Sequence, residues 1–226
     1  HVFARQALPM VWDFAETNPL NEQAASWPMC VDVIASELEA LAGTWTGSQD
    51  VRRGSAMTLS WQDASVDCVI TDPPYYDNVP YASISDFFYV WLKRSLGGLF
   101  PDHFASEGTP KKAEAVADAL RHGGSNDKAR EAYEEMMAAS FREANRVLKP
   151  SGQMTIVYAH KTTLGWATLV DAMRKAGFTV TEAWPLDTEN ASRLRAMDSA
   201  ALASSIFLVA RKRDGAATGY EDQVRP

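Results

Sequence analysis

The chain has 226 residues, the length of one α/β domain or of one domain with appended segments. Its 46% apolar and 23% charged residues exclude collagen, a coiled coil and wholesale disorder. With 22 basic and 29 acidic residues the formal net charge is −7, which excludes a uniformly basic coat for nucleic acid. A local basic groove stays compatible with this total, because the field in a cleft depends on nearby charges.

Several features of the sequence indicate a cytoplasmic protein outside the membrane. No apolar stretch reaches the ~18 residues of a membrane span. The N-terminus lacks the basic-then-apolar order of a signal peptide. Cys30 and Cys68 have no metal-ligand or disulfide spacing, and Cys68 is expected to be a buried thiol. The histidines share no ligand spacing, so no metal site is expected. The chain begins without methionine, which indicates a piece of a longer protein.

The first half of the chain predicts helices around one clear strand. Apolar residues three and four apart predict an amphipathic helix over 27–42, after a short helix near 12–16. Residues 51–56 are interpreted as a short strand. Residues 66–72 are apolar at both parities, which is typical of a strand buried on both faces of a parallel sheet. An aromatic helix is expected over 83–96, with its rings in the core.

The second half continues the alternation of helices and strands. Residues 101–126 hold Pro, Gly, Lys and His around one weak helix over 111–120, so a mobile insertion is expected there. The remaining elements are expected as helix 127–148, strand 153–160, helix 163–176, strand 178–186, crossover 188–203 and strand 204–213. This order predicts an α/β fold with a doubly wound, mostly parallel sheet and helices on both faces.

One tetrapeptide, Asp72-Pro73-Pro74-Tyr75, stands out at the end of the strand over 66–72. Ligands of open α/β sheets bind at the carboxyl ends of the strands, so the position of the motif indicates a ligand-binding site. The prolines have no N–H and a fixed φ, which makes their carbonyls rigid acceptors. Pro73 also favours an extended Asp72 before it. Tyr75 adds a flat ring beside these acceptors.

A carboxylate, a fixed carbonyl and an aromatic face together suit a planar group that carries an NH₂. The acceptors bind the amino hydrogens and orient the nitrogen lone pair, while the ring stacks on the heterocycle. A plain proline-rich turn with a capping Asp and a packed Tyr is the simpler interpretation. The buried strand before the motif and the aromatic helix after it favour the functional one.

The tetrapeptide resembles the catalytic motif of S-adenosylmethionine-dependent amino-methyltransferases, which methylate exocyclic amines of adenine or cytosine. With Asp at its first position, the motif resembles that of the enzymes that methylate adenine at N6. Enzymes that methylate cytosine at N4 more often carry Ser at this position. The stretches 5–16, 72–96 and 133–160 are similar to large bacterial adenine-specific DNA methylases with an N-terminal domain of unknown function. The likeness extends over roughly residues 1–213.

This resemblance implies a Rossmann-like methyltransferase catalytic domain over 1–213, followed by a polar tail at 214–226. Its implied activity is methyl transfer from S-adenosylmethionine to N6 of adenine in DNA. Within the motif Asp72-Pro73-Pro74-Tyr75, the Asp72 carboxylate and the Pro73 carbonyl would hold the amine. Tyr75 would stack on a flipped-out base.

Further residues are expected to complete the site. Those expected to contact the substrate are Tyr75, Tyr76, Asn78 and His122, although Tyr76 and Asn78 equally suit plain loop positions. Those expected to contact the cofactor are Arg52, Gly54 and Asp72. Basic residues at 52–53, 93–94, 111–112 and 211–213 either form a rim facing DNA phosphates or are scattered solvated charge.

The sequence departs from this family in one respect. Such enzymes bind the cofactor through a glycine-rich F-x-G-x-G loop after the first strand, and no such pattern occurs here. We therefore expect the fold to lack its first glycine-loop unit, which an upstream portion of the same protein would supply. That portion and DNA are the expected partners, and this chain alone is expected to be inactive.

Three alternatives to DNA adenine-N6 methylation stay open from the sequence. The enzyme could methylate adenine N6 in RNA or cytosine N4 in DNA. The chain could also be a non-catalytic DNA-binding module of a larger methylase. Methyl transfer separates the enzymes from the module, and the identity of the methylated base separates the enzymes from one another.

Overall fold

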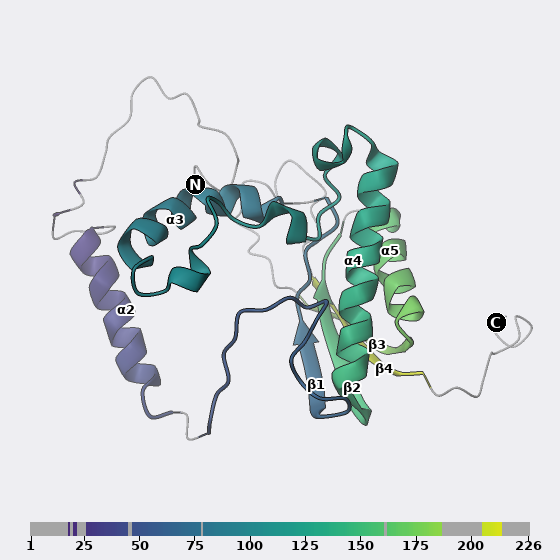
Figure 1. Cartoon of the computed structure of the whole chain (residues 1–226). Coiled ribbons are helices and arrows are strands. Elements are labelled where there is room, and N and C mark those ends of the chain that lie inside the picture. The colour runs from purple at the N-terminus through teal and green to yellow at the C-terminus, as the bar shows by residue number, and fades with distance from the viewer. Residues whose placement is uncertain are drawn as a thin grey trace, which may run out of the picture. The chain divides into compact units, whose positions relative to one another are not determined.

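The computed structural model describes residues 18, 20–21, 26–44, 47–77, 79–160, 162–186 and 205–213. The chain divides into two compact units, residues 1–53 and 54–226, which are described separately (Figure 1). The first unit contains helix α2 (Trp27–Leu41), which confirms the helix predicted there. The Ser26 side chain accepts the Met29 N–H at its start, and a proline lies in its first turn, as is typical of a helix N-terminus. The helix expected near 12–16 lies outside the described residues.

The second unit contains the sheet and the motif. Its longer elements are β1 (Val66–Thr71), α3 (Tyr81–Leu96), α4 (Asn126–Val147), β2 (Leu148–Tyr158), α5 (Thr163–Lys175), β3 (Phe178–Leu186) and β4 (Ser205–Lys212). Three short 3₁₀ helices lie between α3 and α4, namely η1 (Pro101–His103), η2 (Lys111–Ala113) and η3 (Ala119–His122). The α/β class is therefore confirmed, and each of these longer elements overlaps its predicted range, although β2 begins at Leu148 and not at 153. The crossover at 188–203 and the tail at 214–226 are outside the described ranges.

The four strands lie in the order β1-β2-β4-β3. β1 and β2 pair in parallel, with Thr71 opposite Ile156, whereas β4 is antiparallel to both of its neighbours. β1, β2 and β3 therefore run in one direction, as a mostly parallel sheet requires. Because β4 lies between β2 and β3, two of the three pairings are nevertheless antiparallel, which the sequence did not predict.

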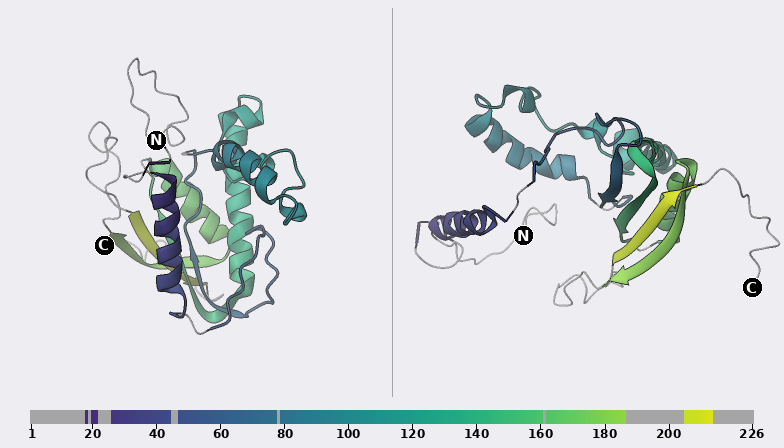
Figure 2. Two further views of the ribbon diagram at one scale, coloured as in Figure 1. Left: turned by 90° about the vertical axis from the view of Figure 1, so that its left-hand side faces the viewer. Right: turned by 90° about the horizontal axis from the view of Figure 1, so that it is seen from below.

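One face of this sheet carries the hydrophobic core. On β2, alternate residues Met154, Ile156 and Tyr158 are fully buried, and their neighbours on the other face are only half-buried. Helix α4 contacts β2, helix α5 contacts β3, and the two helices contact each other (Figures 1 and 2). We expected helices on both faces, but within the described part of this unit α4 and α5 share one face. The other face has no described helix packed on it.

β1 shows the same asymmetry more strongly, and two expectations about it are wrong. It was expected to be buried on both faces, yet Ile70 is 75% exposed. Cys68, expected to be a buried thiol, is exposed as well. Both point to the face that α4 does not cover, and β1 lies at the edge of the sheet. β1 is thus more apolar than is usual for a strand that the described residues leave this exposed.

Helix α3 forms as predicted, but its aromatic side chains do not join the core. Phe87 and Phe88 are each 49% exposed and Trp91 is 57% exposed, and no residue of the helix is buried. The spacing of its apolar residues predicted the helix, but the expectation that its rings lie in the core is wrong. No helix in the described ranges is both long and apolar enough to cross a membrane.

Two predicted elements between the longer ones do not form. Residues 51–56 make no strand, since the only pairing there is an isolated bridge between Ser55 and Thr58. The helix expected over 111–120 is replaced by η2, an extended stretch and η3. Tertiary hydrogen bonds explain the second case, because the Ala117 N–H donates to the Tyr76 carbonyl at 2.9 Å. Such bonds override a local helix propensity.

The insertion over 101–126 is bonded to α3. Asp86 accepts the Thr109 N–H at 2.9 Å and forms a 2.5 Å ion pair with Lys111. These bonds, that of Lys111 first, lower the pKa of the Asp86 carboxyl to about 2. Glu114 accepts the Ala82 N–H at the start of α3 and pairs with Arg121 at 2.7 Å. Polar side chains thus connect the insertion to this helix.

Candidate active site

The Asp72-Pro73-Pro74-Tyr75 motif begins where β1 ends. Because β1 and β2 are parallel and in register at Thr71 and Ile156, the motif leaves the same edge of the sheet at which β2 ends. The ring of Tyr75 accordingly lies against that of Tyr158, the last residue of β2, with centroids 5.2 Å apart. This is the carboxyl edge, where open α/β sheets bind ligands.

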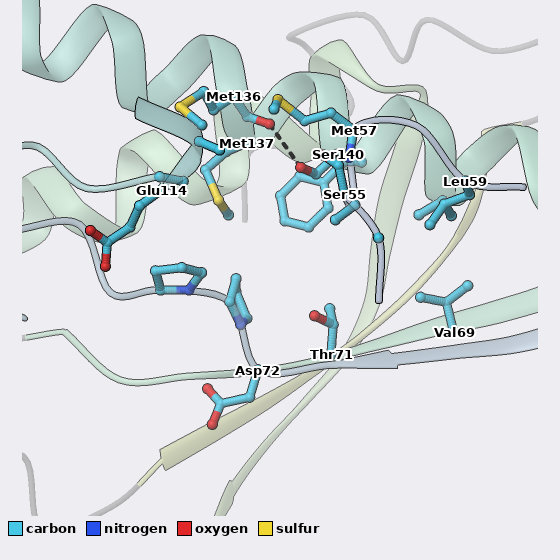
Figure 3. A pocket seen from close by; sticks show the side chains of 18 of the residues that line it. Ser55, Met57, Leu59, Val69, Thr71, Asp72, Glu114, Met136, Met137 and Ser140 are labelled. Atoms are coloured by element: carbon cyan, nitrogen blue, oxygen red, sulfur yellow. Dashed lines mark hydrogen bonds between the residues drawn. The ribbon is translucent and has the colours of Figure 1, made fainter. Parts of the chain in front are cut away.

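Asp72 presents an exposed carboxylate at this edge. Successive side chains of a strand point to opposite faces, so Thr71 points toward α4 and Asp72 points away from it (Figure 3). Among the described residues, the Asp72 carboxylate has no hydrogen bond or ion pair. It is therefore available to accept a hydrogen bond from a ligand.

The hydroxyl of Tyr133, on α4, bonds to the turn that follows Asp72. It donates to the Pro74 carbonyl at 2.7 Å and accepts the Tyr76 N–H at 3.2 Å. Tyr133 is fully buried, and this burial raises the pKa of its hydroxyl above 10. The Pro73 carbonyl, by contrast, accepts no hydrogen bond within the part of the chain that the structure describes.

The motif is supported by a cluster of aromatic rings from the ends of β1 and β2. Tyr75 meets Tyr158 edge to face at 76°, and Tyr158 meets Trp166 in the same way at 5.1 Å. Tyr76 contacts the rings of Tyr133 and His160 at 5.3 and 5.8 Å. Edge-to-face contacts of this kind favour one ring orientation. The direction of the Tyr75 ring is therefore set by Tyr158.

His160 lies next to this cluster, just beyond β2. Its Nδ1 accepts the Thr162 N–H at 3.1 Å, and its Nε2 lies 3.5 Å from a carboxylate oxygen of Asp77. Trp166 donates its indole N–H to the His160 carbonyl at 3.0 Å. A Cβ on Gly165 would overlap the imidazole ring, so only glycine fits beside His160 in this arrangement. This histidine joins the motif loop to the start of α5.

A cavity of about 850 Å³ opens between β1 and α4. Figure 3 shows Val69 and Thr71 of β1 on one side of it and Met136, Met137 and Ser140 of α4 on the other. Further lining residues are Gly54, Ser55, Met57, Leu59, Asp72, Pro73, Pro74, Glu114 and Phe141. A mostly apolar lining with a few polar groups is typical of a small-molecule site.

The segment that closes one side of this cavity is held by Arg146 of α4. The Arg146 guanidinium donates to the carbonyls of Leu59 and Trp61, both at 2.9 Å, and pairs with Asp63 at 2.6 Å. Glu143 pairs with Arg146 at 2.8 Å and accepts the Leu59 N–H at 2.9 Å. These bonds, that of Arg146 first, lower the pKa of the Glu143 carboxyl to about 2.

The structure brings only some of the predicted site residues together. Gly54, Asp72, Pro73 and Pro74 all line the cavity, whereas Tyr75 and Tyr76 lie on the motif loop outside it. Arg52 belongs to the first unit, where it pairs with Asp50 at 2.7 Å. His122 ends η3 and does not line the cavity. Asn78 lies outside the described residues.

Sequence reasoning missed Tyr133, Arg146 and His160 as residues of the site. Tyr133 was assigned to the apolar face of its helix, and its polar hydroxyl on that face was the available signal. Nothing in the sequence links Arg146 to Leu59, which lies 87 positions away. In the described ranges, no cluster of three or more His, Cys, Asp or Glu side chains could hold a metal ion.

No protein-family model and no curated protein matches the chain. Among solved structures it is similar to TTHA0409, a candidate DNA modification methylase from Thermus thermophilus (20% identity, TM-score 0.39, 75% of this chain and 55% of that chain). TTHA0409 complexed with S-adenosyl-L-methionine gives 20% identity and a TM-score of 0.37 over 73% and 54%. A third similar structure is the Haloferax volcanii complex of the Trm112 methyltransferase activator with a candidate methyltransferase. Its sequence identity is 16% and its TM-score is 0.38, over 77% of this chain and 66% of that chain.

This chain thus spans about half the length of TTHA0409.

Proposed function

We propose that this chain is the catalytic part of an S-adenosylmethionine-dependent methyltransferase that methylates the N6 amine of adenine in DNA. The observation that carries the proposal is the placement of Asp72-Pro73-Pro74-Tyr75 at the carboxyl end of β1, with its first acceptor exposed. A capping Asp in a proline-rich turn would accept a hydrogen bond from the turn. Here Asp72 has no partner among the described residues.

The motif residues would bind and orient the target amine. The Asp72 carboxylate and the Pro73 carbonyl would each accept one amino hydrogen, which directs the nitrogen lone pair toward the methyl donor. Tyr75 would stack on the base, which must leave the duplex to reach this edge. Orientation of this kind needs no strong base before attack, because the acceptors polarise the amine.

The cavity suits one part of the cofactor. When bound, S-adenosylmethionine supplies an activated methyl group on its sulfonium. A mostly apolar space between Leu59, Val69 and Phe141, with Ser55 and Glu114 as polar groups, suits a flat heterocycle. Gly54 and Asp72, both predicted cofactor contacts, lie on its wall, with the Asp72 carboxylate pointing away from α4 (Figure 3). Arg52, the third, remains a proposal.

The remaining cofactor contacts are proposed to come from an upstream portion of the same protein with a glycine-rich loop. β1 supports this, because in the described residues it pairs with β2 alone and its Ile70 is exposed. An edge strand offers unpaired N–H and C=O groups to another strand. A strand paired there in parallel would end beside Asp72, and a loop after it would face the motif.

The full-length protein with DNA and tritiated cofactor tests this function. Digestion of the labelled DNA to nucleosides is expected to place the label in N6-methyladenine. Label in N4-methylcytosine, or label only when RNA is supplied, would replace the proposal by one of the alternatives. If the protein binds DNA but transfers no labelled methyl group, the result would favour the non-catalytic DNA-binding module. Asp72→Ala serves as the inactive control.

A further inference from the structure

We propose that Tyr133 is a positioning residue for this reaction, because its buried hydroxyl fixes the backbone on both sides of Tyr75. The inference rests on the proposed function for its effect on turnover, but the geometry stands by itself. Residue 133 lies on α4, at a distance of 57 to 59 positions from the atoms that it holds. Its role therefore depends on the fold and not on the motif's own sequence.

Two hydrogen bonds of the Tyr133 hydroxyl enclose Tyr75. The bond to the Pro74 carbonyl fixes the peptide before Tyr75, and the bond from the Tyr76 N–H fixes the peptide after it. A hydroxyl is one of the few side-chain groups that can donate and accept at once. Phenylalanine at position 133 would fill the same space and make neither bond.

The backbone after Tyr75 needs such a restraint. Tyr76 has a φ of 31°, in the left-handed region that residues other than glycine rarely adopt. Conformations of this kind persist where the surrounding structure holds them. Here the Tyr76 N–H is held by Tyr133, and its carbonyl accepts the Ala117 N–H at 2.9 Å. Both peptide groups of the strained residue are thus bonded.

The same hydroxyl selects which acceptors face a ligand. The Pro74 carbonyl is occupied by Tyr133, and of the remaining motif acceptors Asp72 is the exposed residue while Pro73 is buried. Burial of Tyr133 raises the pKa of its hydroxyl, so the proton that it donates is retained around neutral pH. The hydroxyl therefore donates to the Pro74 carbonyl in its neutral form.

Tyr133→Phe in the full-length protein tests the inference, with Tyr89→Phe as a matched control. The Tyr89 hydroxyl also donates from a helix to a distant main-chain carbonyl, that of Ser106, at 2.7 Å. Hydrogen exchange of the peptide over 74–78 and steady-state methylation of DNA are measured for both variants. In Tyr133→Phe we expect faster exchange of the Tyr76 amide and a kcat lower by roughly 10- to 100-fold, with little change in KM. Tyr89→Phe should match wild type in both.

Each outcome bears on the inference. Unchanged exchange over 74–78 in Tyr133→Phe would overturn it, and so would faster exchange with an unchanged kcat in an active enzyme. If Tyr133→Phe does not fold, hydrogen exchange of the Tyr76 amide in the wild-type protein tests the inference. Exchange as fast as that of an unprotected amide would be incompatible with the bond to Tyr133 and would overturn it. Faster exchange in a protein whose wild type transfers no methyl group would overturn the proposed function and retain the restraint.

Discussion

The Asp72 carboxylate at the carboxyl edge of the sheet contributes little to folding, whereas the residues that follow it are tied to the core. Asp72 is exposed and unpaired among the described residues. Pro74 and Tyr76 bond to Tyr133, and Tyr75 packs on Tyr158. Substitutions at Asp72 should therefore separate activity from stability, while substitutions at its neighbours should affect both.

Asp72→Ala should abolish most methyl transfer and leave the fold intact. Loss of a carboxylate that holds the amine is expected to lower kcat in the full-length protein by about 100-fold or more. The melting temperature should stay close to that of wild type. Asp127→Ala, another exposed carboxylate of this unit, is the control and should keep its activity. Full activity in Asp72→Ala would contradict the assigned role.

At Tyr75 the ring, and not the hydroxyl, is expected to matter. Tyr75→Phe keeps the edge-to-face contact with Tyr158 and should keep much of the activity. Tyr75→Ala should weaken binding of the target base by about 1–3 kcal/mol through lost stacking. Fluorescence of 2-aminopurine at the target position measures the flipped state and should rise with wild type and Tyr75→Phe. Equal losses in both variants would assign the role to the hydroxyl.

Among the elements, α4 does most to organise the site. Its middle carries Tyr133 under the motif loop, and its last turns carry Glu143 and Arg146, which hold the segment around Leu59. Its Met136 and Met137 line the cavity. One helix thus positions both the motif and the wall opposite it, so damage to α4 should disturb both together.

The Glu143–Arg146 pair predicts how stability depends on pH. The Glu143 carboxyl has a pKa lowered from 4.5 to about 2, chiefly by Arg146. A lowered pKa in the folded state adds stability that is complete above pH 4.5 and is lost as the pH falls toward 2. Urea unfolding at several pH values should show Glu143→Gln less stable than wild type near neutral pH. The difference in the free energy of unfolding between Glu143→Gln and wild type should shrink as the pH falls from 4.5 toward 2.

Glu135→Gln is the control for this measurement, because Glu135 is exposed on the same helix. Its free energy of unfolding should follow wild type at every pH. A difference between Glu143→Gln and wild type that stays constant from neutral pH to about 2 would show that the ion pair is not the cause.

Gly165→Ala should destabilise the start of α5. Alanine normally favours a helix over glycine by about 1 kcal/mol, but here the added Cβ would overlap the imidazole of His160. We expect a net loss of about 1–3 kcal/mol in the free energy of unfolding. Gly98→Ala, where a Cβ has no atom within 4 Å, should change it by less than about 0.5 kcal/mol. A stabilised Gly165→Ala variant would mean that His160 lies elsewhere.

The sequence predicted elements better than it predicted their surroundings. Periodicity located α2, α3, α4, α5 and the four strands, because helix and strand spacing is a local property. It could not predict the bond from Ala117 to Tyr76 that replaces a helix with extended chain. The motif was found because its chemistry lies in consecutive residues. Tyr133 was missed because its contacts are 57 and 59 positions away.

For the molecule as a whole, the described structure holds one side of the proposed site. The motif, the cavity and their supports all belong to residues 54–226. The F-x-G-x-G loop that the proposed reaction requires is not in the sequence. The protein is therefore expected to need a second segment before it turns over.

Isothermal titration of the purified 226-residue chain tests this dependence. We expect S-adenosylmethionine to bind in the high micromolar range or more weakly, with a binding free energy of roughly −5 kcal/mol or smaller in size. The glycine-rich loop that brings backbone close to the cofactor is missing. No methylation of DNA is expected from this chain alone. Low-micromolar binding would contradict the need for an upstream portion.

The open edge of β1 also has a consequence for handling the protein. Val66–Thr71 is a six-residue segment of mostly apolar and β-branched side chains at the margin of the sheet. Such a segment can template pairing between copies and start cross-β aggregation. Asp67, paired with Lys149 at 2.6 Å, is the only charge on the strand to oppose it. Aggregation of this chain should therefore rise steeply with protein concentration, and Ile70→Lys should suppress it.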